Sequence, residues 1–226
     1  MFTIRSLLVG IAILSIILAL PARRFTLNRY ALETVNKSKS GWVLFENEIE
    51  PNARYETDWL NWERISYEDF CARREQSELH LPMHTLFRRI GWIALDCTGL
   101  TEADLTGLTC LNSIRRLDLE NPPALYSLPK FSSLECVQIY NSHFKHNKTN
   151  DFAPVNTVKS VLFNSSFIGS WEAGWLSSLT NLDTLCFADC EINNFPSCNW
   201  RLITGFGLSN CKLDSDLSFL TECKKN

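Results

Sequence analysis

The sequence predicts an α/β fold of about six similar units, each with one short strand and a return segment that leads to the next strand. Six stretches share a template with apolar residues at positions 1, 4, 6 and 11 and a small hydrogen-bonding residue at position 9. They begin at Ile90, Ile114, Leu134, Val158, Leu182 and Ile203, with spacings of 20 to 24 residues. Repeats of this period stack side by side and bury one continuous core. A separate apolar run near the N-terminus predicts a membrane helix before the repeats.

Within each repeat, positions 4 and 6 predict a strand, because strand side chains alternate between two faces and position 5 then faces away from the core. We expect the residue at position 9 to bond buried backbone groups where the chain turns. These residues are Thr98, Ser142, Ser166, Cys190 and Cys211. Apolar residues three apart between Asp104 and Leu111 predict a short helix or 3₁₀ turn. Pro122 and Ala124 depart from the template and predict an irregular turn in the second repeat.

The two C-terminal copies carry the most complete form of this pattern. The copies that begin at Leu182 and Ile203 match L-x-x-L-x-L-x-x-N/C-x-L at every position, and in this the chain resembles the leucine-rich repeat family. The resemblance covers about residues 90–220. It implies a curved solenoid with a parallel sheet on the concave side and short helices or 3₁₀ turns on the convex side. It also implies recognition of a protein or ligand by the concave side.

Residues 1–22 are predicted to be a transmembrane anchor or a cleaved signal peptide. The run from Leu7 to Leu20 carries no charge, and residues 5–21 form the predicted single span. A basic start, an apolar middle and small residues also fit a signal peptide. Pro21 spoils the cleavage site, however, and Arg23 follows the apolar run directly, which favours an uncleaved anchor. Basic residues downstream of the run favour a cytoplasmic repeat domain.

Three further segments flank the repeats. Residues 23–41 are predicted to form a basic juxtamembrane helix, and 42–89 an aromatic-rich N-terminal cap with a strand at 42–45 and a helix at about 58–75. Residues 221–226 form a polar tail. In this order of segments, with Arg23, Lys39 and Gly41 at the junctions, the chain is similar to small bacterial proteins that carry a membrane segment and a leucine-rich repeat tail.

Charge and cysteine content restrict the classes of function. Residues 41–226 carry sixteen basic and twenty-four acidic side chains, which argues against nucleic acid as a partner. Most of the nine cysteines fall on predicted strands, turns or apolar return segments, such as Cys110, which favours reduced packing thiols over disulfides. Cys198 and Cys223 are the best pair for a bridge if the domain is exported. No cofactor motif is present.

The candidate binding residues lie at strand positions 3, 5 and 7, which face away from the core. Aromatic and arginine side chains dominate many protein interfaces, so Trp92, Arg116 and Tyr140 are the expected main contacts. The full set for the concave face is Trp92, Asp96, Arg116, Asp118, Glu120, Gln138, Tyr140, Leu162 and Asn164. The alternative is that these are solvated strand residues without a partner.

Three functions follow, and the first is favoured. It is a membrane-anchored, non-catalytic protein that recognises another protein through the concave sheet. The second is a structural envelope scaffold whose repeats pack on copies of themselves. The third is a metal-dependent enzyme or sensor that uses His143 and His146, although a metal site needs further ligands that the surrounding sequence does not supply.

Overall fold

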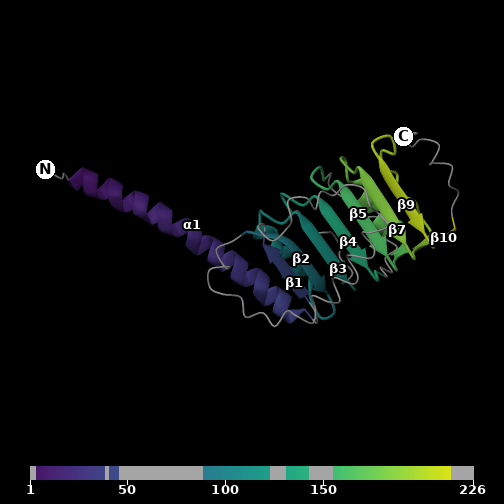
Figure 1. Cartoon of the computed structure of the whole chain (residues 1–226), viewed down its shortest axis with the longest axis horizontal. Helices are drawn as coiled ribbons and strands as arrows, with labels where there is room; N and C mark the ends of the chain where they lie inside the picture. Colours follow the sequence, from purple (N-terminus) through teal and green to yellow (C-terminus); the bar gives the residue numbers. More distant parts are fainter. Residues whose placement is uncertain (1–3, 39–40, 46–88, 123–130, 143–154, 215–226) are drawn as a thin grey trace.

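The computed structural model describes residues 4–38, 41–45, 89–122, 131–142 and 155–214 (Figure 1). Within residues 4–21 it describes the backbone, but side chains only at Ser15 and Ala19. The helices are α1 (Ile4–Lys37), α3 (Glu102–Gly107), the 3₁₀ turn η2 (Leu108–Cys110) and α4 (Ser170–Ser177). The short helix or 3₁₀ turn predicted between Asp104 and Leu111 is thus confirmed. The helix α3 begins at Glu102, two residues before the predicted start.

A seven-stranded sheet forms the body of the molecule, in the order β1-β2-β3-β4-β5-β7-β9. Its strands are β1 (Gly41–Phe45), β2 (Ile90–Asp96), β3 (Arg116–Glu120), β4 (Cys136–Tyr140), β5 (Ser160–Asn164), β7 (Thr184–Ala188) and β9 (Gly205–Ser209). Six of them are parallel, and β1 pairs antiparallel with β2. The predicted α/β class is confirmed, as is the strand predicted at residues 42–45.

A smaller parallel sheet follows three of the turns. It consists of β6 (Phe167–Ile168), β8 (Glu191–Ile192) and β10 (Lys212–Leu213), in the order β10-β8-β6. These strands begin at position 10 of their repeats, immediately after the turn. The chain therefore forms one ladder before each turn and, in the last three repeats, a second ladder after it.

The strand register agrees with the sequence template at every repeat. Consecutive strands place their position 4 residues opposite one another, in the series Ile93, Leu117, Val137, Val161, Leu185 and Phe206. The position 6 residues form a second series, Leu95, Leu119, Ile139, Phe163, Phe187 and Leu208. A slip of one residue would turn these side chains to the other face, so the apolar pattern fixes the pairing.

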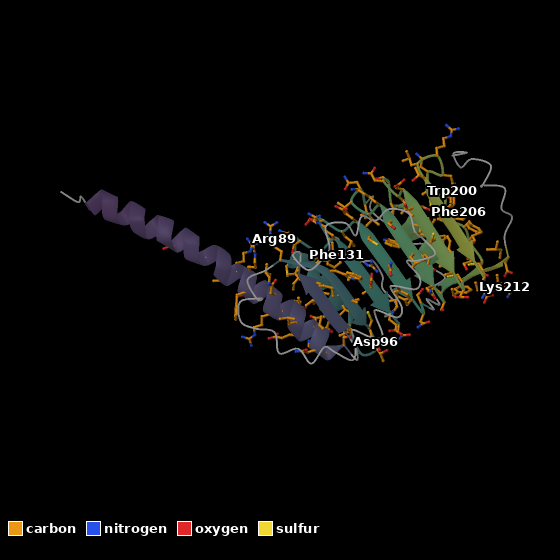
Figure 2. The ribbon with its side chains drawn as sticks, viewed as in Figure 1. Arg89, Asp96, Phe131, Trp200, Phe206 and Lys212 are labelled. Atoms are coloured by element: carbon orange, nitrogen blue, oxygen red, sulfur yellow. The ribbon has the colours of Figure 1, made fainter. Side chains whose placement is uncertain are left out.

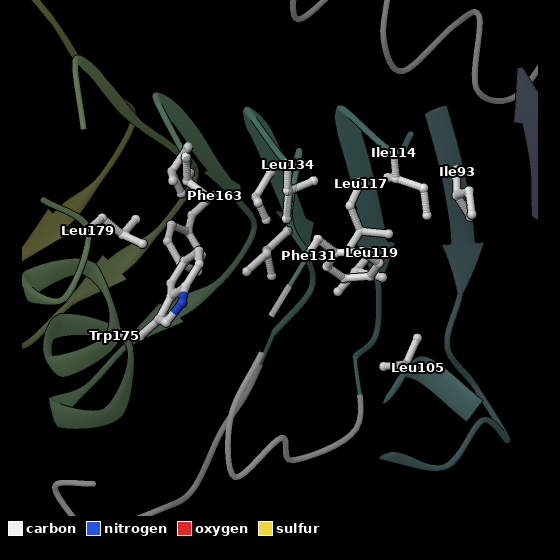
Figure 3. Packing of buried hydrophobic residues seen from close by; sticks show 14 of the residues in the cluster. Ile93, Leu105, Ile114, Leu117, Leu119, Phe131, Leu134, Phe163, Trp175 and Leu179 are labelled. Atoms are coloured by element: carbon white, nitrogen blue, oxygen red, sulfur yellow. The ribbon is translucent and has the colours of Figure 1, made fainter. Parts of the chain in front are cut away.

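The core lies between the six parallel strands and their return segments (Figure 3). Leu105 of α3, Phe131 and Trp175 of α4 reach it from the return side, and all three are buried. Phe163 stacks on Phe187 with ring centroids 5.8 Å apart, and Trp175 meets Phe163 edge-on at 6.3 Å. Each such aromatic pair contributes about 0.5–1.5 kcal/mol beyond the area that it buries.

The turns after the strands use a left-handed residue at position 8. Its φ angles are 47° to 53° at Asn121, Asn141, Ser165, Asp189 and Asn210. Asn and Asp tolerate this conformation better than most residues because their short side chains bond locally. The backbone N–H of each of the first four residues donates to the carbonyl of position 7 on the next strand. The turn thereby extends the strand ladder by one bond.

Position 9 matches its predicted role in three of the five named residues. Ser166, Cys190 and Cys211 donate to the carbonyl two residues earlier, and both thiols also reach a carbonyl of the preceding repeat. The prediction was wrong for Thr98, which is exposed, and for Ser142, whose buried hydroxyl has no partner.

In the first repeat, the turn residue whose side chain points toward the core is at position 8, whereas in the later repeats it is at position 9. Cys97, at position 8, is 1% exposed and its thiol approaches the carbonyl of Leu95. The left-handed residue is Gly99, with φ of 88°, instead of the residue at position 8. Leu100 is buried at position 11 as in the template, so this turn differs in its path and not in its length, and Thr98 lies on the surface.

The C-terminal part of α1 packs against the first repeat, while its N-terminal part extends away from the sheet (Figure 1). Ala31 and Val35 are buried in the core cluster together with Val43 of β1. Tyr30 lies so close to Gly107 that a Cβ there would sit 1.9 Å from the tyrosine hydroxyl. This part of the predicted juxtamembrane helix therefore covers the N-terminal end of the core.

Several predicted segments fall outside the described residues. They are the cap region beyond Phe45, its helix at about 58–75, and the tail 221–226. The backbone of the predicted span at residues 5–21 is helical, as part of α1. Among the residues that the structure describes, no helix is both long enough and apolar enough to cross a membrane.

Candidate binding face of the sheet

The outer face of the sheet comprises positions 3, 5 and 7 of the six parallel strands, opposite the core cluster. All nine predicted binding residues lie on it, because they alternate with the core residues along β2, β3, β4 and β5. Trp92, Glu120, Tyr140 and Asn164 are partly exposed. Asp96, Arg116, Asp118, Gln138 and Leu162 are buried, so the alternative of solvated strand residues is wrong for these five.

A buried ion pair stands at the centre of the cluster. The Arg116 guanidinium donates from Nε and Nη2 to the two carboxylate oxygens of Asp118, at 3.0 and 3.1 Å. Burial raises the pKa of Asp118 above its ordinary value, against the opposing charge and hydrogen bonds of Arg116. Asp118 is 3% exposed and Arg116 9%, so removal of either partner would leave the other charge buried and uncompensated.

Trp92 connects the first two strands of the cluster. Its Nε1 donates to Asp118 Oδ2 at 2.9 Å, and its ring lies under the Arg116 guanidinium, whose Cζ is 3.7 Å from the ring centroid. Trp92 and Arg116 occupy position 3 of neighbouring strands and pair directly in register. A cation above an indole at this distance is attracted by the ring electrons. The three side chains thus form one rigid unit.

Gln138 occupies the next strand, directly opposite Asp118 in register. Its side chain is 0% exposed, and its Oε1 accepts a hydrogen bond from the Tyr140 hydroxyl. Its Nε2 is buried and has no hydrogen-bond partner in the described part of the chain. A buried polar group left in this way costs about 1–3 kcal/mol, so natural proteins rarely retain one without a use.

The remaining predicted residues stabilise turns or separate the polar and apolar parts of the face. Asp96 accepts bonds from the backbone and hydroxyl of Thr98 and from Asn121. Glu120 accepts from Asn141, and Asn164 accepts from Ser165, so all three act at the turn edge of the sheet. Leu162 lies beside Gln138 on the following strand, where the face becomes apolar.

Two cysteines on this face were not among the predicted binding residues. Cys136 is 1% exposed near Arg116, and burial raises the pKa of its thiol to about 12. Cys186 is 7% exposed and lies so close to Gly207 that a Cβ there would sit 2.6 Å from its sulfur. Cys136 is at position 3 of its repeat and Cys186 at position 5, and these positions were sufficient to place both residues on the outer face. The Cys136 thiol is not activated as a nucleophile, because burial disfavours its thiolate.

The described residues contain no group of three or more histidine, cysteine or acidic side chains arranged to hold a metal ion. His143 and His146, the predicted ligands of the metal hypothesis, lie outside the described residues. The seven cysteines in the described part of the chain are free thiols, and Cys110, placed by its sequence in an apolar return segment, is exposed.

Comparison with protein-family models, curated proteins and solved structures finds no match to this chain.

Proposed function

We propose that the chain is a leucine-rich repeat protein, anchored in a membrane through residues 5–21, that binds another protein through the outer face without catalysis. The observation that carries the proposal is the constant register of six parallel strands, which brings Trp92, Arg116, Asp118, Gln138 and Tyr140 together on one face. Such a ladder supports a solenoid in which this face is concave. Tryptophan, arginine and tyrosine are also the residues most enriched at binding hot spots.

The anchor and its orientation rest on the sequence. Residues 7–20 are uncharged, and six basic residues with one acidic residue occur among residues 1–40. A positive flank downstream of the span supports a repeat domain on the cytoplasmic side. Protection of the C-terminal domain from added protease in intact cells tests the orientation, and digestion there contradicts it.

One observation favours the second candidate, a self-associating scaffold. In the part of the chain that the structure describes, β9 and β10 each pair on one side alone. Trp200 packs edge-on against the half-buried Phe206 at this end, with ring centroids 5.5 Å apart (Figure 2). Leu202 nearby is 45% exposed. Unpaired strand edges are templates for pairing with another chain. In the scaffold function, a second copy of this chain would pair with these edges.

Site-specific photocrosslinking of the full chain in its membrane separates the two functions. A benzophenone amino acid at Tyr140 tests the outer face, and the same group at Leu202 tests the C-terminal end. We expect a discrete product with a different protein from position 140 and none from position 202. A product at twice the mass of the chain from position 202 alone supports the scaffold, and the absence of any product from position 140 refutes recognition by the face.

A further inference from the structure

The buried amide of Gln138 differs from every other polar group of the cluster on the outer face. Asp118 accepts bonds from Arg116 and Trp92, and the Gln138 oxygen accepts one from Tyr140, whereas the two N–H groups of Gln138 Nε2 have no acceptor among the residues that the structure describes. The amide is oriented with its oxygen toward the Tyr140 hydroxyl, which donates to it, so the end that needs a partner is the Nε2 donor.

The surroundings of this amide select a neutral acceptor. The neighbour on one side is Asp118, whose charge is balanced by Arg116 and whose ionised form is already disfavoured by burial. An anionic ligand at Gln138, one strand away and about 5 Å from Asp118, would be repelled by the Asp118 carboxylate and would lose its hydration. A carbonyl oxygen needs no such compensation and accepts well from an amide N–H.

The neighbours on the other side are apolar and small. At the same position of the following strands lie Leu162, Cys186 and Gly207. The acceptor therefore stands at a border between a charge-balanced polar cluster and an apolar strip. A ligand that carries a carbonyl oxygen next to a branched aliphatic group matches both sides of the border.

We propose that Gln138 is the recognition residue of the outer face, and that its Nε2 donates to a neutral carbonyl oxygen, from a backbone or a side-chain amide, on a bound protein. This inference rests on the proposed function and names the chemistry of the partner. Because Gln138 has no exposed surface, the acceptor reaches it by displacing a neighbour. Tyr140 is that neighbour, since it is half-buried and bonded to the same amide.

Two small probes test the chemistry directly on the full chain in detergent micelles. Isovaleramide offers a neutral carbonyl beside a branched aliphatic group, and isovalerate offers a carboxylate beside the same group. The chain contains two glutamines, Gln76 and Gln138, so selective ¹⁵N labelling of glutamine side chains gives two pairs of NH₂ signals. The variant Gln138→Met removes one pair and assigns the other.

We expect isovaleramide to move the Gln138 signals in a saturable way, with a Kd on the order of millimolar, and to leave the Gln76 signals in place. Isovalerate should produce less than a tenth of this shift at equal concentration. The proposal is overturned by an unmoved Gln138 signal, by an equal response at Gln76, or by a larger response to isovalerate.

The crosslinking experiment distinguishes failure of this inference from failure of the proposed function. With the benzophenone at position 140, Gln138→Met should reduce the yield of the product with the partner protein at least tenfold, while Glu191→Gln, at an exposed position of the smaller sheet, leaves it within twofold. A product that persists in Gln138→Met leaves recognition standing and refutes the role of Gln138. A missing product in the unmodified chain refutes recognition, and the probe titration then decides the amide chemistry separately.

Discussion

Removing the carboxylate of Asp118 tests whether the polar cluster is an integral part of the fold. Asp118 accepts three hydrogen bonds, from Arg116 Nε and Nη2 and from Trp92 Nε1, and is 3% exposed. The substitution Asp118→Leu leaves the Arg116 charge in its buried site without this carboxylate. Breaking a buried pair by removal of one partner typically costs about 3–5 kcal/mol. This is a large part of the roughly 5–15 kcal/mol that stabilises an average domain.

The double variant Arg116→Met, Asp118→Leu removes the charge together with its counter-ion, and replacement by apolar groups of similar size is often neutral. We expect its free energy of unfolding to lie within about 2 kcal/mol of the unmodified chain, which gives a coupling of at least about 1 kcal/mol in the double-mutant cycle. Glu120→Gln, at the half-exposed end of the same strand, is the control and should cost less than about 1 kcal/mol.

Urea unfolding of the full chain in mild detergent, followed by circular dichroism, measures the two single variants Asp118→Leu and Arg116→Met, the double variant and the control. Asp118→Leu should shift the midpoint to much lower urea at an unchanged slope. A cost below about 1 kcal/mol for Asp118→Leu, or a double variant that is as unstable as the sum of the single ones, would contradict the account of the cluster.

Three further predictions concern the core and the helices. Burial raises the pKa of Glu172 to about 7, so the folded state favours its protonated form; the free energy of unfolding should fall by up to about 3 kcal/mol between pH 5 and 8, and Glu172→Gln should flatten that slope in urea titrations. Gly107→Ala forces a Cβ against Tyr30 and should cost about 1–3 kcal/mol by thermal unfolding, partly recovered by adding Tyr30→Ala. Iodoacetamide at pH 8 should modify the exposed Cys110 well before Cys190, whose pKa burial raises to about 12, as read by mass spectrometry of the native chain.

The pattern of apolar residues was sufficient to predict the strands and their register. Positions 4 and 6 alternate with polar residues, and one buried face allows a single register. The sequence also carried an unused signal for the turns, since Asn or Asp stands at position 8 in Asn121, Asn141, Asp189 and Asn210. These residue types favour the left-handed conformation that the structure adopts there.

The two errors at position 9 have a physical cause that the template does not contain. In the first repeat Gly99 takes the left-handed conformation two residues later than in the other turns, and Cys97 lies inward and Thr98 outward. At Ser142 the backbone N–H donates to Ser166 Oγ, so the turn is closed without the Ser142 hydroxyl. The five residues predicted to act at position 9 are all small hydrogen-bonding residues, so a single sequence does not show these differences between the turns.

The sequence predicted which residues form the candidate site but not which contacts they make. Alternation along a strand places Trp92, Arg116 and Asp118 on one face, and neighbouring position 3 residues are bound to meet once the register is known. Alternation says nothing about what covers that face. The burial of Gln138 and the lone Nε2 amide therefore required coordinates, because they depend on how neighbouring side chains fill the space above the sheet.

The same limit applied to α1. Its basic residues favoured a juxtamembrane helix, and the sequence analysis did not predict that one side of the helix is apolar and packs on the core. Ala31 and Val35 lie four residues apart on one side of the helix and enter the core, and Lys37 pairs with Asp104 at 2.9 Å. Ser38 Oγ then donates to the carbonyl of Asp96, at the end of the first strand of the outer face. The helix is therefore fixed to the sheet by packing and polar contacts and does not act as a flexible tether. If residues 5–21 span a membrane, the outer face is held at one orientation to it, and a partner in or on that membrane meets Gln138 without the search that a loose linker imposes.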